Sequence, residues 1–285
     1  MFNRCWIAVI ITLLFSFGIL VYNSGADDRK VTGKMIASIE NNMVLIPAGE
    51  FLMGGQNAAN ESPQHKVYLD VFYIGKYEVT FEEYEEFCSD AGYNRPVDPQ
   101  YGYQPPDEDM VGDRMPVMNV TRDDTEAFCA WLSKKTGKHY RLPTEAEWEK
   151  AARGGLTCKE YPWGNESPDA GDIYRANYGP GLNHFVWKKD GYENTAPVGS
   201  YPPNGYGLHD MAGNVWEWVQ DEYRSDYNIK SSYKNPNGQT KSLSGIIRGG
   251  CFSSKSEHLR CAKRYAIRPG SCSFLMGFRI ARDQE

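Results

Sequence analysis

The chain has 285 residues, of which 41% are hydrophobic and 24% charged, and its formal net charge is −6 at pH 7. This composition is that of an ordinary globular protein, and the length suits one large domain or two small ones. Because the charge is negative and no run of Lys or Arg stands out, we expect no nucleic-acid partner, which would need a basic surface. The 28 Gly, 16 Pro, 7 Trp, 19 Tyr and 12 Phe favour an irregular, loop-rich fold over a helical bundle.

The N-terminus has the pattern of an export segment. Arg4 precedes a nearly uninterrupted apolar run from Trp6 to Tyr22, and Asp27-Asp28 follow it. Residues 1–26 are therefore predicted to be either a signal peptide, cleaved near the small residues Ser24-Gly-Ala26, or an uncleaved membrane anchor. Both alternatives place the remainder outside the cytoplasm, in the periplasm, secreted or anchored facing outside. Any contact with a membrane is expected through this segment alone.

The next residues alternate between short strands and helices. Residues 27–42 are polar and weakly patterned, and are predicted as a linker. Strands are expected within Met43–Gly54, around a Pro-Ala-Gly turn, and over Val67–Ile74. Three helices are predicted, two of them from a threonine N-cap, Thr80 or Thr144, with a Glu three residues on as a capping-box partner. They are expected from Phe81 to about Asp90, from Thr121 or Asp123 to Gly137, and after Thr144. Residues 154–203 are predicted to be mostly loop.

Six cysteines lie beyond the apolar segment: Cys88, Cys129, Cys158, Cys251, Cys261 and Cys272. An even number in an exported chain predicts disulfide bonds, although the sequence does not fix their pairing. No CxxC is present, which argues against a thioredoxin-like centre or a zinc ribbon.

The most informative short run is Gly213-Asn-Val-Trp-Glu-Trp218. In an extended segment Trp216 and Trp218 point to one face and Glu217 to the other, so the two tryptophans are expected in the core. A buried carboxylate without a partner is costly, so Glu217 must face water, a basic group or a metal ion.

Eight short runs of sequence, spread in order over residues 43 to 282, match the motifs of one family. They are Met43–Gly54, Pro116–Thr121, Arg141–Glu149 with Ala151–Gly155, Tyr161–Asn165, Pro203–Leu208, Gly213–Trp218, Arg248–Gly250 and Gly277–Arg279. Together they resemble the formylglycine-generating enzyme, or sulfatase-modifying factor, family. The resemblance implies an α+β fold: a single compact, loop-rich domain over residues 43–283, related to C-type lectins and low in regular secondary structure.

The resemblance also implies two structural calcium sites, whose ligands would be carboxylate, amide and carbonyl oxygens. The first matches Asn177 and Asp190 through side chains and Tyr178 and Tyr192 through carbonyls. The second matches Asp210, Gly213, Val215 and Glu217. The alternative for each acid is that it pairs with an Arg or caps a turn.

Authentic members of the family oxidise a sulfatase cysteine to formylglycine with oxygen and a copper(I) ion held by two thiolates, which are the soft ligands Cu(I) needs. Here Ser254 stands where the first of these cysteines is expected, the intervening loop is about three residues shorter, and neither copper-binding cysteine is in place. We therefore expect copper to be absent. Cys251 and Cys272 lie near this loop and are the candidates for a displaced catalytic pair. The alternative is that these two cysteines form a structural disulfide, or that one of them is a buried thiol.

Three functions follow from the resemblance. The first is a maturation or accessory factor outside the cytoplasm, which acts on a protein or peptide partner, such as a sulfatase-like substrate, without the standard formylglycine activity. The second is a non-catalytic, lectin-like binding domain that presents Phe252 to Leu259 and Tyr265 to Leu275 to its partner. The third and weakest is a copper-dependent oxidase with displaced cysteines.

Overall fold

The computed structural model describes residues 24–94, 112–179, 189–238 and 242–284. The helices in these ranges are α1 (Ser24–Asn41), α2 (Phe81–Ala91), α3 (Arg122–Thr136), α4 (Glu145–Arg153) and α5 (Tyr227–Lys230), with short 3-10 turns η1 (Ala59–Glu61), η3 (Ala170–Asp172) and η4 (Ser256–His258). The strands are β1 (Met43–Ile46), β2 (Gly49–Met53), β3 (His65–Leu69), β4 (Phe72–Gly75), β5 (Tyr140–Arg141), β6 (Trp216–Glu222), β7 (Gly245–Arg248), β8 (Tyr265–Ile267), β9 (Met276–Phe278) and β10 (Ala281–Asp283).

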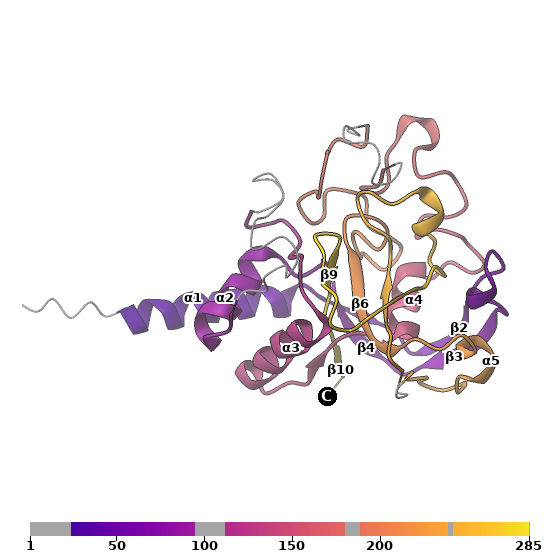
Figure 1. The fold of residues 1–285 in the computed structure, drawn as a ribbon. Coiled ribbons are helices and arrows are strands. Elements are labelled where there is room, and N and C mark those ends of the chain that lie inside the picture. The colour runs from indigo at the N-terminus through magenta and orange to yellow at the C-terminus, as the bar shows by residue number, and fades with distance from the viewer. Residues whose placement is uncertain (1–23, 95–111, 180–188, 239–241, 285) are drawn as a thin grey trace, which may run out of the picture.

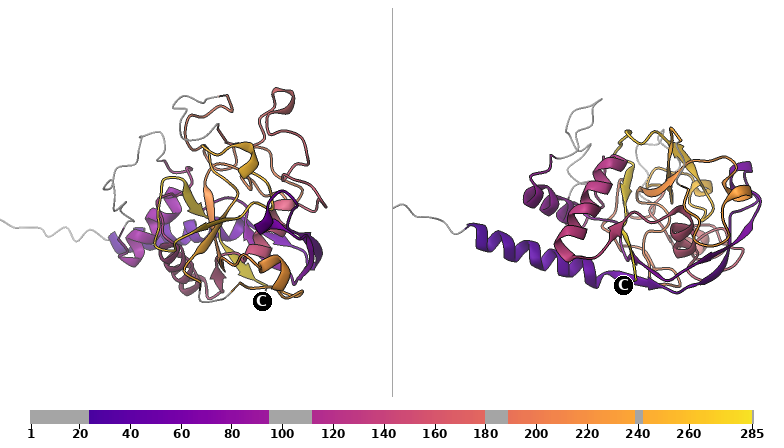
Figure 2. Two further views of the ribbon diagram at one scale, coloured as in Figure 1. Left: turned by 45° about the vertical axis from the view of Figure 1, so that its right-hand side comes forward. Right: turned by 90° about the horizontal axis from the view of Figure 1, so that it is seen from below.

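The strands form three small sheets. Their orders are β1-β4-β10-β5, β2-β3 and β8-β7-β6-β9, and within the last sheet β6 runs parallel to β9. Figures 1 and 2 show α1, α2 and α3 gathered at one end of the molecule, with the β2–β3 pair and α5 at the other. Short strands joined by long connections confirm the expected loop-rich α+β fold.

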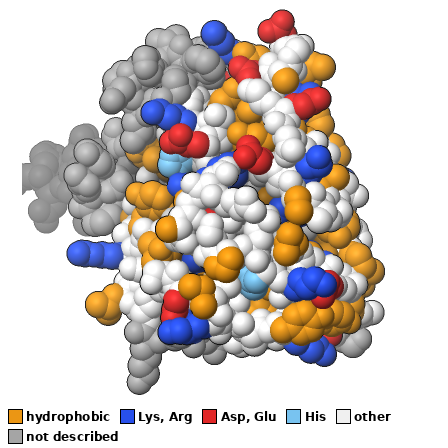
Figure 3. Space-filling view, turned by 90° about the vertical axis from the view of Figure 1, so that its right-hand side faces the viewer, with side chains coloured by type: hydrophobic (Ala, Val, Ile, Leu, Met, Phe, Trp, Pro, Cys, Tyr) orange, Lys and Arg blue, Asp and Glu red, His pale blue; other side chains and the backbone are white. Residues whose placement is uncertain are grey.

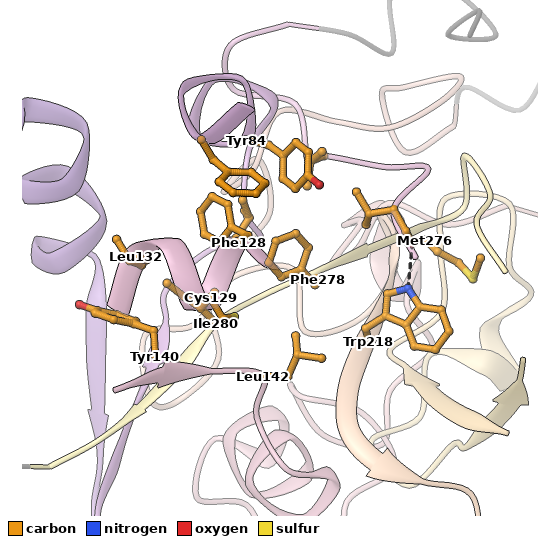
Figure 4. Packing of buried hydrophobic residues seen from close by; sticks show 14 of the residues in the cluster. Tyr84, Phe128, Cys129, Leu132, Tyr140, Leu142, Trp218, Met276, Phe278 and Ile280 are labelled. Atoms are coloured by element: carbon orange, nitrogen blue, oxygen red, sulfur yellow. Dashed lines mark hydrogen bonds between the residues drawn. The ribbon is translucent and has the colours of Figure 1, made fainter. Parts of the chain in front are cut away.

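Strand β6 separates two hydrophobic clusters. Trp216 and Trp218 lie in the cluster that contains the apolar faces of α2 and α3, whereas the next residue, Val219, lies in the cluster around Trp148 of α4. Figure 4 shows the first cluster, where the Trp218 indole N–H donates to the carbonyl of Val120 at 3.0 Å. The predicted alternation of Trp, Glu and Trp is therefore confirmed, and both faces of the strand are buried.

The predicted helix starts are confirmed with their capping boxes. Thr80, Thr121 and Thr144 each accept a hydrogen bond from the backbone N–H three residues on, and the acid at that position bonds back to the cap. The second helix therefore starts at Thr121 and not at Asp123. Each of the three helices ends at a glycine, Gly92, Gly137 or Gly154, whose backbone is in the left-handed conformation. Glycine adopts this conformation readily because it has no Cβ to clash.

One expectation about the first eighty residues was wrong, and another gains a structure. The interval predicted as a linker forms helix α1, because Met35, Ile36 and Ile39 lie at helical spacing and pack against the cluster of α2 and α3. The strand predicted over Val67–Ile74 is divided between β3 and β4, which belong to different sheets.

Two predictions concern the N-terminus and the cysteines. The export segment falls almost entirely on residues 1–23, which lie outside the described residues. In the described ranges no helix is long and apolar enough to cross a membrane. The predicted disulfides are absent: none of the six cysteines beyond the apolar segment is bonded to another.

Candidate functional site

Exposed hydrophobic side chains do not by themselves mark a site on this protein. On the face shown in Figure 3 they are interspersed with acidic and basic side chains, which is ordinary for a folded protein. A cavity of about 570 Å³ at the C-terminal loops is a stronger candidate, since ligand sites are concave and mostly apolar. It is lined by Trp216, Ile247, Cys251, Ser253, Ser254, Lys255, Glu257, His258, Tyr265, Ile267, Ser271, Cys272, Ser273, Leu275 and Met276. We call it the C-terminal pocket.

Three aromatic rings form one wall of the C-terminal pocket. The Trp216 ring centroid lies 5.6 Å from that of Tyr265 and 5.9 Å from that of His258, with interplanar angles of 42° and 88°. Burial, together with the nearby positive charge of Lys263, lowers the pKa of His258 below its usual value. The imidazole is therefore neutral at neutral pH. Tyr265 is 47% exposed, so the wall opens toward solvent.

The loop after β7 places a thiol and two hydroxyls at the base of the pocket. Cys251 is buried, and its Sγ lies 3.3 Å from Ser254 Oγ and 3.5 Å from Ser253 Oγ. Burial raises the pKa of the Cys251 thiol, so this residue is protonated at neutral pH. Copper(I) needs two thiolates, whereas hydroxyls and a protonated buried thiol are poor ligands for it. The residues present here do not fit the copper site of the family.

The alternative pair, Cys251 and Cys272, is brought to the same pocket. The two residues come from loops on either side of β8, and no disulfide joins them. Within the described ranges, no group of three or more His, Cys, Asp or Glu side chains converges in a way that could hold a metal ion.

The residues of the first predicted calcium set lie together. The Asp190 carboxylate accepts the backbone N–H of Tyr178 at 2.9 Å and that of Tyr192 at 3.3 Å, and burial raises its pKa to about 6. Asn177 is buried, and its amide nitrogen donates to the carbonyl of Asn194 at 2.8 Å. A buried carboxylate beside a fixed amide supplies oxygen ligands of the kind that calcium binds, and calcium at this set stays a prediction.

The second predicted set adjoins the first. The backbone N–H of Asn214 donates to the carbonyl of Asn177 at 2.9 Å, and a Cβ on Gly213, at a φ of 85°, would come within 2.0 Å of the same oxygen. Only glycine therefore allows this approach. Asp210 accepts the backbone N–H of Gly199 at 2.7 Å, and burial raises its pKa to about 6.

Glu217, the remaining side chain of the second set, already has protein partners. Its carboxylate accepts two hydrogen bonds from Arg279, at 2.6 and 2.7 Å, and one from the Trp148 indole at 2.7 Å. The alternative of pairing with an Arg is thus what the structure shows for Glu217. Calcium at this set stays a prediction; Glu217 Oε1 accepts one of these three hydrogen bonds and Oε2 accepts two. Glu78, also buried, lies beside Asp210 and Glu217, and burial together with these two carboxylates raises the pKa of Glu78 well above its usual value.

The sequence did not predict that Trp216 lines a pocket, because its motif predicts only a core position. His258 belongs to the segment Phe252 to Leu259 predicted for binding, but its contact with Trp216 was not predictable from that segment. Their meeting depends on the loop that carries η4 folding back over β6. The signal that was available is the change of length in that loop, which marks where the chain departs from the family.

The fold and the pocket together define a class: single-domain, loop-rich α+β proteins of the formylglycine-generating-enzyme type. Residues 30–284 match the family described as "Sulfatase-modifying factor enzyme 1-like domain". The chain belongs to this sulfatase-modifying factor family.

Relatives and solved structures agree with this assignment. The formylglycine-generating enzymes of Mus musculus and Streptomyces coelicolor are 32% and 34% identical to the chain; each alignment covers 85% of it, and 75% and 89% of the respective enzyme. The structure of PvdO from Pseudomonas aeruginosa is similar with a TM-score of 0.71 and 32% identity, over 85% of this chain and 94% of that one.

Proposed function

We propose that this protein is an extracytoplasmic maturation or accessory factor that receives a segment of a protein or peptide partner in the C-terminal pocket. It does so without the copper-dependent conversion of cysteine to formylglycine. The family supplies the expectation of a protein partner, because relatives named formylglycine-generating enzymes share the whole domain. The basic start and apolar run of residues 4–22 supply the expectation of export.

The observation that carries the proposal is the chemistry at the base of the pocket. Ser253 and Ser254 offer hydroxyls where a copper site needs thiolates, and the one thiol beside them, on Cys251, is buried and protonated. The concave, aromatic-walled cavity above them remains large enough for a side chain and its flanking backbone. Binding is thus supported by the geometry, and thiolate oxidation is not.

The direct test is an oxidation assay on a peptide that carries a sulfatase-type cysteine motif. The purified domain is incubated with the peptide, oxygen and copper(I), with the Streptomyces coelicolor relative as positive control. We expect the peptide mass to stay unchanged with this protein and to fall with the relative. A fall in mass that disappears in Cys251→Ala would instead establish the oxidase with displaced cysteines.

A non-catalytic binding domain is the second candidate, and one observation favours it. Residues of both segments predicted for binding, Phe252–Leu259 and Tyr265–Leu275, line the same pocket. A photo-reactive amino acid at position 257, at the rim, should capture the partner in cells, whereas the same group at the distant position 233 should not. Mass spectrometry of the captured partner then separates the candidates: a modified side chain supports maturation, and an unmodified one supports binding alone.

We also propose a structural calcium ion at Asn177, Tyr178, Asp190 and Tyr192. An ion that binds only the folded state raises the unfolding temperature as its concentration rises. Calcium should therefore stabilise the wild-type domain relative to a chelator, and Asp190→Ala should abolish most of that difference. Asp226→Ala, at the half-buried residue that precedes α5, should keep it. An equal response of the wild type and Asp190→Ala would refute this site.

Location is tested separately from activity. The protein expressed in its own host is fractionated, and the N-terminal residue of the recovered chain is determined. Recovery outside the cytoplasm with a start near residue 27 supports a cleaved signal peptide, and recovery in the membrane with residue 1 intact supports an anchor. Recovery in the cytoplasm would overturn the proposed location.

A further inference from the structure

We infer that the C-terminal pocket receives a planar aromatic group, such as the ring of an aromatic side chain in the partner. This inference rests on the proposed role of the pocket and specifies the chemistry of what enters it. Three features of the pocket lead to it: the arrangement of its rings, the sulfur and aliphatic side chains that complete its walls, and the charges around His258.

The three rings of the wall contact one another at the angles that aromatic pairs prefer. Trp216 stands nearly perpendicular to His258 and is tilted by 42° from Tyr265, with centroids 5.6 to 5.9 Å apart. Aromatic pairs favour edge-to-face and offset arrangements at such distances over a flat sandwich. An inserted ring can therefore contact a face of one residue and an edge of another. An aliphatic side chain would gain contact area here without this directional term.

Half of the residues that complete the lining are aliphatic or carry sulfur, and the other half are polar or charged. Ile247, Ile267 and Leu275 supply aliphatic contacts, and Met276 supplies a thioether, while Cys251 and Cys272 add two further sulfur atoms. Sulfur of Met and Cys makes favourable contacts with aromatic ring edges. The volume of about 570 Å³ accommodates a ring together with the chain segment that carries it.

The charges decide between an aromatic ring and a cation, since an aromatic wall also attracts ammonium and guanidinium groups. The charged side chains in the lining are Lys255 and Glu257, and the Glu257 carboxylate lies 3.5 Å from His258 Nε2. Burial lowers the pKa of His258, so the imidazole is neutral and adds no charge. The lining thus holds one charge of each sign, so an entering Lys or Arg side chain would lose hydration without a net negative charge to receive it.

The test measures binding of five short peptides, identical except for a central Phe, Tyr, Leu, Lys or Arg, to the full exported domain by calorimetry. Free p-cresol is a sixth probe, which distinguishes a small aromatic molecule from a side chain held in a peptide. The Phe and Tyr peptides should bind most tightly. Tyr265→Leu should weaken them by about two- to tenfold, and Tyr265→Phe should leave them within about twofold of wild type.

The control variant is Tyr233→Leu, which removes a tyrosine of similar exposure, 54% against 47%, far from the pocket. It should leave all affinities unchanged. If the Lys or Arg peptide binds most tightly, or if Tyr265→Leu binds the Phe peptide like wild type, the aromatic inference is overturned while a partner-binding pocket stands. If none of the six probes binds, the pocket's proposed role is overturned as well.

Discussion

The Glu217–Arg279 ion pair shows how one carboxylate is kept charged inside this protein. Both side chains are fully buried, and the guanidinium donates to both carboxylate oxygens while Trp148 donates to one of them. Removing two charges from water costs several kcal/mol, which only such complete pairing offsets. The pair thus ties β6 to the segment between β9 and β10.

Removing one partner of this pair should therefore be severe. We predict that Arg279→Met destabilises the domain by about 3–5 kcal/mol, because Glu217 is left buried without a counter-charge. Urea unfolding followed by tryptophan fluorescence measures the loss. Arg175→Met, which breaks an ion pair with the exposed Glu166, should cost less than about 1 kcal/mol. Equal losses in the two variants would contradict this account of the buried pair.

The sequence predicted half of this arrangement. The alternation of Trp216, Glu217 and Trp218 is local, so its two faces could be assigned from strand geometry alone. The partner could not, because Arg279 is 62 positions away and reaches Glu217 only once β9 pairs with β6. The same limit applies to the C-terminal pocket, where Tyr265 and His258 approach Trp216 from separate loops.

Helix α4 is the element in which local and tertiary effects meet. Thr144 caps its start as the sequence predicted, yet every residue from Glu145 to Arg153 is buried. Its acids are paired with distant arginines, Glu145 with Arg264 and Glu149 with Arg248. The capping box involves only four consecutive residues, so the sequence could predict where α4 starts. The burial of so polar a helix depends on distant arginines, so the sequence could not predict that α4 lies in the interior of the fold.

The same helix start should make stability depend on pH. The Asp221 carboxylate of β6 accepts the backbone N–H groups of Glu145 and Gly238, both at 2.6 Å. Burial, and next the charge of Glu145, raises its pKa from 3.8 to about 7. The folded state then binds more protons than the unfolded state between these values. The contribution of Asp221 to stability is fully present below pH 3.8 and is lost as pH rises through about 7, by at most roughly 1.4 kcal/mol per pH unit.

Asp221→Asn should remove this pH dependence, because the amide does not titrate. The variant should also lose about 1–3 kcal/mol at pH 5, since the amide nitrogen cannot accept a backbone N–H. Urea midpoints at pH 5, 6 and 7 test both effects. Asp226→Asn is the control, because Lys230 and Arg224 lower the pKa of Asp226 to about 2 and it stays ionised over this range. An unchanged pH slope in Asp221→Asn would contradict the assignment.

At the scale of the whole molecule, the cysteines show that an even number of them does not by itself predict disulfide bonds. An even number in an exported chain favours disulfides, but none of the six described cysteines is bonded to another, although some of them share an environment. Cys88 and Cys129 lie in the cluster of α2 and α3, Cys261 lies in the cluster of α4, and Cys158 is exposed. The hydrophobic clusters on both sides of β6 form without a covalent link, so we expect the domain to fold with its thiols reduced.

Alkylation without reductant tests this expectation over the whole chain. In the folded protein Cys158 should react with iodoacetamide fastest. Cys129, Cys251 and Cys261 should resist, because burial raises their thiol pKa values, to about 12 for Cys261. In urea all six cysteines of the described part should be alkylated, as shown by peptide mapping. Cys158→Ser should remove the fast adduct. Two cysteines that stay protected in urea until a reductant is added would establish a disulfide and refute the reduced fold.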